Sequence, residues 1–162
     1  MVLVINEQER FLMSIVKLSK KLNLLFLRKR PFFFKRSKLS AYVSTILFAT
    51  LIGTYLELYF IGKEFYDFPK RPFPEVFSIN ISFTIIGLPL FVFLFLYLAE
   101  KVTPYIRVLL IITISLFAPA IEMQTELLGF FHHNESWNHF YSFFGYFLFL
   151  IIVWRFYQWS RV

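Results

Sequence analysis

The stretch YVSTILFATLIGTYLELYFI, residues 42–61, decides the fold class of this 162-residue chain. It is apolar or weakly polar throughout, except for one charged residue, Glu57. A helix of about 20 residues crosses the hydrocarbon core of a bilayer, which is roughly 30 Å thick. We therefore predict a membrane-spanning helix here, because lipid offers no partner to an unpaired backbone.

Three further apolar runs have a similar length, at residues 78–98, 105–125 and 139–159. The run at 105–125 is the weakest, because Arg107 and Glu122 lie near its ends and a re-entrant or tilted segment is the alternative. The chain is 58% hydrophobic and 22% aromatic, more than a soluble domain of this length can bury. The sequence predicts an all-α integral membrane four-helix bundle at residues 41–162, after a cytoplasmic arm at residues 1–40.

The distribution of charge predicts the topology. Ten of the 17 Lys and Arg residues precede the first span, and four spans place fourteen on one side and three on the other. By the positive-inside rule both termini are then cytoplasmic. We expect the first span to act as an uncleaved anchor. Seven acids lie at or near the outer face: Glu57, Glu64, Asp67, Glu75, Glu122, Glu126 and Glu135.

The arm contains the stretch RFLMSIVKLSKKLNLLFLR, residues 10–28, in which apolar residues recur at helical spacing. This pattern predicts an amphipathic helix that lies in the membrane plane. The bases that follow, mixed with three phenylalanines, favour anionic lipid over nucleic acid because they adjoin the first span. The predicted lipid-binding bases are Lys17, Lys20, Lys21, Arg28, Lys29, Arg30, Lys35, Arg36 and Lys38.

Acidic side chains in a span indicate function by default, because their burial is costly. Glu57 lies about one turn inside the outer end of the first span, and Glu122 and Glu126 share one helix face at i, i+4. In a bundle these three carboxylates converge below the outer surface. The proline-rich loop at residues 64–77 is predicted to form a stiff cap over them, with Arg71 as the counter-ion of Glu57 or Glu122.

The stretch HHNESWNH, residues 132–139, adds His132, His133, Glu135 and His139 to the same region. Together with Glu126, these histidines offer nitrogen and oxygen ligands that suit Zn²⁺ or another divalent ion. Adjacent histidines tend to point apart, and the chain has no His-Glu-x-x-His pattern. We interpret the segment as a solvated interfacial loop, with a metal or proton site as the alternative.

Several landmarks taken in order resemble a poorly characterised family of small multi-pass membrane proteins from endospore-forming bacteria, often labelled by a clostridial "CBO" locus tag. The resemblance covers roughly residues 28–145 and supports the topology and the cell-membrane location, but it implies no reaction. Ser136 and Trp137 depart from the Gly-Trp that the family commonly shows. The residues that carry the resemblance are Arg28, Lys29, Arg30, Pro31, Glu57, Phe68, Pro69, Arg71, Pro74, Phe77, Ile79, Asn80, Pro89, Pro119, Glu122, Trp137 and Ser142.

The sequence has no glycine-rich phosphate loop, no Gly-x-Ser-x-Gly motif and no cysteine, so we predict no cofactor and favour a non-enzymatic role. Our first hypothesis is association with lipid and with a membrane-protein partner or a second copy, and not with nucleic acid. The first alternative is a small permease or ion- or proton-handling subunit that uses Glu57, Glu122 and Glu126. The second is a membrane-embedded metal hydrolase that uses His132, His133, His139 and a glutamate.

Overall fold

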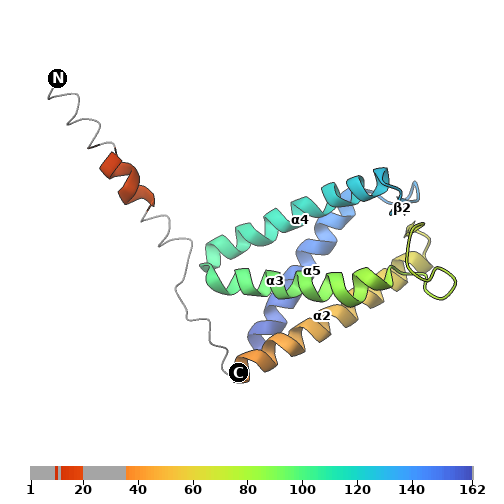
Figure 1. The fold of residues 1–162 in the computed structure, drawn as a ribbon, viewed down its shortest axis with the longest axis horizontal. Coiled ribbons are helices and arrows are strands. Elements are labelled where there is room, and N and C mark those ends of the chain that lie inside the picture. The colour runs from red at the N-terminus through yellow and green to blue at the C-terminus, as the bar shows by residue number, and fades with distance from the viewer. Residues whose placement is uncertain (1–9, 11, 20–35, 162) are drawn as a thin grey trace.

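A computed structural model of the chain describes residues 10, 12–19 and 36–161. Residues 12–19 of the arm are helical and exposed, Lys17 among them (Figure 1). The bases Lys20, Lys21, Arg28, Lys29, Arg30 and Lys35 and the side chain of Arg36 lie outside the described residues. The in-plane placement of the arm therefore stays a prediction.

Four long helices make up the described part after the arm. They are α2 (Arg36–Gly62), α3 (Leu88–Lys101), α4 (Pro104–Leu127) and α5 (His139–Trp159), and a π-helix, η1 (Phe83–Gly87), leads directly into α3. Each is long and apolar enough to cross a membrane, η1 and α3 together. The all-α four-helix bundle is confirmed, and the third apolar run forms one helix of full spanning length.

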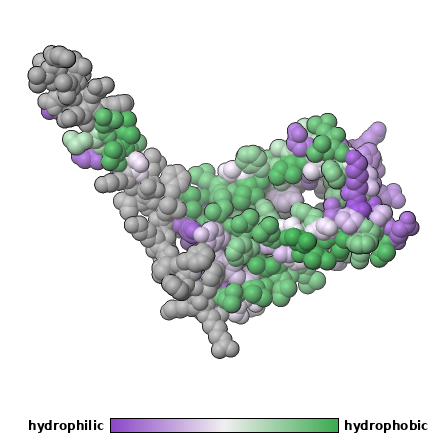
Figure 2. Space-filling model, in the orientation of Figure 1, coloured by the Kyte–Doolittle hydropathy of each residue, from purple (hydrophilic) through white to green (hydrophobic). Residues whose placement is uncertain are grey.

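The helices alternate in direction along the bundle (Figure 1). Helix α4 packs against α5, and α2 packs against both α3 and α5. Two short strands, β1 (Tyr66–Asp67) and β2 (His132–His133), pair antiparallel at what we name the sheet end. At the other end, the hairpin end, α3 joins α4 through Val102 and Thr103. Figure 2 shows polar residues gathered at the sheet end and apolar residues along the helices.

Small residues allow α2 and α3 to approach closely, as the spacing of Ala49 and Gly53 predicts. Ala49 is fully buried, and a Cβ added to Gly53 would collide with Cδ2 of Leu88. The apolar core continues from this contact through side chains of α3 and α5, such as Val92 and Leu150, which are also fully buried. The α2–α3 contact therefore depends on the missing side chain at Gly53.

A π-helical turn precedes α3 because Pro89 has no backbone N–H to donate. The N–H of Leu88 donates to the carbonyl of Phe83, five residues back, which is the π-helical pattern. This turn places Thr84 on the inside, where it is buried. Pro119 lies within α4, and the helix continues through it.

At the hairpin end, the carboxylate of Glu100 joins three helices, an arrangement that our sequence interpretation missed. Lys38 Nζ lies 2.5 Å from Glu100 Oε2, and Arg161 Nη1 lies 3.2 Å from Oε1. The hydroxyls of Tyr42 and Tyr157 donate to the same carboxylate over 3.0 and 2.5 Å. Lys38, one of the predicted lipid-binding bases, thus neutralises an acid of the bundle.

We expect Gly53→Val to destabilise the bundle by about 1–3 kcal/mol, because the new side chain must displace Leu88. Gly145→Val is the matched control, since a Cβ at Gly145 meets nothing within 4 Å. Equilibrium unfolding of both variants in detergent measures the difference. Equal stability of the two variants would show that α2 and α3 do not depend on this close approach.

Candidate functional site

A tight turn after α4 brings the histidine-rich segment back over the end of that helix. Gly129 has a φ of +72°, a conformation that glycine adopts without steric cost. Its N–H donates to the carbonyl of Glu126 over 2.8 Å, and that of Phe130 donates to Thr125 over 2.9 Å, which completes a Schellman C-cap. The chain reverses here and enters β2 close to the last turn of α4.

The pairing of β1 with β2 separates the two adjacent histidines. Tyr66 lies opposite His133, and Asp67 lies opposite His132. Because successive side chains of a strand point to opposite faces, His133 is partly buried while His132 is exposed. The structure confirms that these neighbouring histidines point apart.

The third histidine is fixed by the capped start of α5. Asn138 has an extended backbone, and its Oδ1 accepts a hydrogen bond from the N–H of Phe140 over 2.9 Å. His139 is the first residue of the helix, so its ring has a defined place beside α4. The sequence carries this signal, since Asn directly before an apolar run is a typical helix N-cap.

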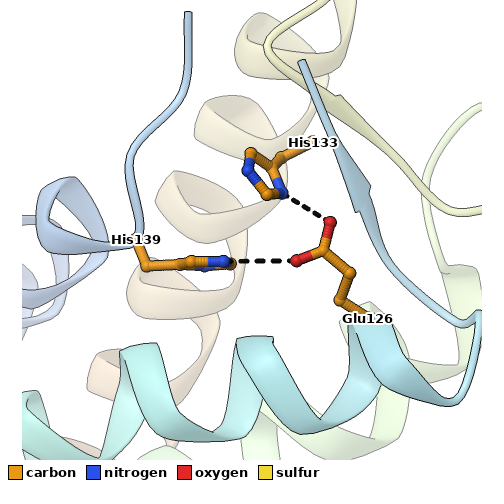
Figure 3. A group of neighbouring side chains, drawn as sticks. All are labelled: Glu126, His133 and His139. Atoms are coloured by element: carbon orange, nitrogen blue, oxygen red, sulfur yellow. Dashed lines mark hydrogen bonds and ion pairs between the residues drawn. The ribbon is translucent and has the colours of Figure 1, made fainter. Parts of the chain in front are cut away.

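These elements bring Glu126, His133 and His139 together around one point (Figure 3). His133 Nδ1 lies 2.5 Å from Glu126 Oε1, and His139 Nε2 lies 3.2 Å from Glu126 Oε2. One ligand atom from each residue falls within 4.8 Å of the others, and all three side chains are partly buried. Three of the four predicted metal ligands thus converge, while His132 does not join them.

A second carboxylate holds His139 from behind. His139 Nδ1 lies 3.2 Å from Glu122 Oε2, and Ser142 Oγ lies 2.6 Å from both oxygens of Glu122. Metal-binding histidines commonly use their second ring nitrogen in this way, which fixes the ring orientation and the tautomer. Glu122 and Glu126 both contact His139, so the prediction that they share a helix face is confirmed.

The ligand set suits a divalent ion of the zinc type. Two imidazoles and one carboxylate form a common three-residue set of zinc sites that keep a fourth position open. The carboxylates of Glu122 and Glu126 both face the imidazole of His139, so this region attracts positive charge. Among the residues that the structure describes, Glu126, His133 and His139 are therefore the side chains that fit a metal ion best.

An open pocket of about 520 Å³ lies beside this group, with His133 in its wall. Its polar lining includes three acids, which attract cations from solution. It gives an ion from outside the bundle a route to His133. The lining residues are Ile61, Glu64, Tyr66, Asp67, His132, His133, Asn134 and Glu135.

The predicted pairing of Arg71 with Glu57 or Glu122 is wrong. Its guanidinium donates instead to the carbonyls of Phe68 and Phe77, each over 2.7 Å, and to Pro74 over 3.4 Å. Within the described ranges, Arg71 makes no ion pair with either acid. Carbonyls of a proline-rich turn have few N–H partners of their own, so the guanidinium satisfies them.

The loop nevertheless covers the sheet end as a cap. Lys70 Nζ donates to the carbonyl of Leu128 over 2.8 Å, and Asn134 donates its N–H to Phe65 over 2.9 Å. Glu57 lies apart from the histidines, within hydrogen-bond distance of the Thr84 hydroxyl and of the N–H of Asn80. The predicted convergence of three carboxylates therefore takes a different form, with Glu122 and Glu126 in one cluster and Glu57 in another.

Comparison with protein-family models, curated proteins and solved structures finds no match for this chain. The resemblance to the membrane-protein family of endospore-forming bacteria therefore stays a prediction. The geometry of the sheet end carries the functional argument.

We expect Gly129→Ala to destabilise the sheet end by about 1–2 kcal/mol, since any other residue is strained at this positive φ. Gly62→Ala is the control, because a Cβ there meets nothing within 4 Å and its φ is not positive. Hydrogen exchange of the amides at residues 129–133 measures the loss of order. Unchanged exchange in Gly129→Ala would show that the turn does not position His133.

Proposed function

We propose that this chain is a four-span membrane protein that binds a divalent transition-metal ion, zinc being the best match, at its outer face. The observation that carries the proposal is the placement of the Glu126 carboxylate between the imidazoles of His133 and His139. A second observation supports the proposal. Glu122 contacts His139 and is itself contacted by Ser142, and such an outer layer of residues behind the ligands is typical of metal sites.

An ion-handling role follows from the shape of the site. Three protein ligands leave a coordination position free, and the acidic pocket beside His133 gives an ion a path in and out. The first alternative drawn from the sequence, an ion- or proton-handling subunit, is thus favoured over association alone. The outer placement rests on the excess of Lys and Arg on the side of the termini.

A zinc-dependent hydrolase is the second candidate function, and the open coordination position favours it. A zinc ion with two histidines, one glutamate and a bound water is the arrangement of hydrolytic metal sites. Zinc-dependent hydrolysis of an activated ester that His133→Ala abolishes would select this candidate. Metal binding without hydrolysis would select the ion-handling role.

Association with anionic lipid through the basic arm is compatible with either role and remains part of the proposal. Its support is the concentration of bases before the first span. Binding of the intact protein to vesicles with and without phosphatidylserine tests it, and equal binding to both would argue against a lipid-specific arm.

We expect the purified protein to bind one zinc ion. His133→Ala should weaken that binding by about 100-fold or more, because loss of a direct ligand should cost at least as much as the largest loss seen for a residue that only supports a ligand. His132→Ala is the matched control, because this neighbouring histidine is exposed and outside the group. Competition with a coloured chelator measures the affinity of each form. An equal loss in both variants would place the ion elsewhere, and the absence of zinc binding in the parent protein would overturn the proposal.

The outer layer gives a second prediction, for Glu122→Gln. The amide keeps the shape but loses the charge that faces His139, so we expect zinc affinity to fall by about 10-fold, the low end of such losses. Glu75→Gln removes a charge from an exposed position of the proline-rich loop, outside the pocket, and should leave the affinity nearly unchanged. Equal small losses in both variants would mean that Glu122 acts only through general electrostatic attraction.

A further inference from the structure

Glu57 is a buried acid within a membrane-spanning helix and lies outside the metal-binding group. The residue is 7% exposed. The N–H of Asn80 lies 3.4 Å from its Oε1, and Oγ1 of Thr84 lies 2.9 Å from its Oε2. Both partners come from the segment that leads into α3, where the π-helical turn directs Thr84 inward.

Glu100 provides the contrast, because it is a partly buried glutamate at the opposite end of the bundle. Lys38 and Arg161 both form ion pairs with it. Across the described part of the chain, no Lys, Arg or His forms an ion pair with Glu57. An ionised carboxylate buried without a cation carries a large desolvation cost, so such a group takes up a proton instead.

The hydrogen-bond geometry around Glu57 fits the protonated acid. Thr84 Oγ1 lies within hydrogen-bond distance of the Asn80 carbonyl, 3.1 Å away, as well as of Glu57. A hydroxyl has one hydrogen and cannot donate to both oxygens. With a proton on Oε2, Glu57 donates to Thr84, Thr84 donates to Asn80, and Oε1 accepts from the Asn80 N–H. Each hydrogen-bonding group of Glu57, Thr84 and Asn80 named here then has a partner.

The same arrangement accepts the ionised acid after a small change. If the proton leaves, rotation of the Thr84 hydroxyl turns its hydrogen from Asn80 to Glu57. The Asn80 carbonyl still has the N–H of Thr84 as a donor, at 3.0 Å. Loss and uptake of the proton thus require the movement of one hydroxyl and no rearrangement of helices.

Other titratable groups around Glu57 come from the three elements that line the sheet end. Tyr66 of β1 and Tyr146 of α5 each lie within electrostatic range of both Glu57 and Glu122 of α4. Burial raises the pKa of Tyr66, so its phenol stays a neutral hydroxyl. A neutral hydroxyl can both donate and accept a hydrogen bond, so such a group can accommodate either protonation state of a neighbouring acid.

We propose that Glu57 is a proton-binding site within the membrane-spanning part of the protein, which exchanges its proton with the sheet end. Its ligand is the proton itself. Thr84 and Asn80 are the groups that accommodate both states. The site is separate from Glu126, His133 and His139, and it stands whether or not these residues bind zinc.

The test is infrared spectroscopy of the full-length protein in lipid nanodiscs across a series of pH values. We expect a carbonyl band of a protonated carboxylic acid at neutral pH that weakens as the pH rises. Glu57→Gln should remove this band, while Glu135→Gln, which changes an exposed acid, should leave it. Glutamine copies the neutral acid in shape and hydrogen bonding, so the variant should keep the fold and the thermal stability of the parent.

Three results would overturn the proposal. Absence of the band in the parent protein would mean that Glu57 is ionised, and its persistence in Glu57→Gln would assign it to another group. A band that does not change with pH would mean that the proton is held permanently and not exchanged. Zinc affinity measured on Glu57→Gln should equal that of the parent, which separates this site from the metal-binding proposal.

Discussion

The Glu100 carboxylate fixes one end of the bundle, and the arrangement of the helices depends on it. It receives groups from the start of α2 and from the end of α5, while it belongs to the last turn of α3. Removal of either cation would leave the negative charge of Glu100 less well compensated. Close by, Arg107 of α4 donates to the carbonyl of Ala99 over 2.8 Å and stacks on Trp154. The hairpin end is therefore tied by charge as well as by packing.

With the hairpin end tied, the sheet end is where the chain has freedom to build a site. Helices α3 and α4 separate from their short connection toward this end (Figure 1). The two strands, the proline-rich loop and the start of α5 fill the space with packed aromatic rings, such as Tyr66, Phe131 and Trp137, and with the polar groups of the candidate site. Loops on a rigid scaffold are where binding residues usually lie. The candidate metal ligands Glu126, His133 and His139 gather at this end.

Hydropathy predicted the four spans because the requirement for an apolar helix of fixed length is local in sequence. The histidine cluster could be predicted only as a set of residue types. Its geometry depends on the positive φ of Gly129 and on the register that pairs Tyr66 with His133. Glu100 was missed, because its partners lie far away in the sequence. Charge complementarity with Lys38 and Arg161 was the available signal. Arg71 was misassigned, because backbone carbonyls competed for it and no residue pattern records them.

The glutamates show that the partner, more than the residue type, sets the role of an acid in a membrane. Glu100 meets cations and remains ionised as part of the framework. Glu122 meets an imidazole and a hydroxyl, and it orients the ring of His139. Glu57 meets only a hydroxyl and a backbone N–H, so nothing there balances a negative charge except a proton. A carboxylate that must exchange a proton has to lack a permanent cation, since a lysine or arginine at that position would hold it ionised. The absence of an ion pair at Glu57 in the described structure is thus what allows it to function as a site.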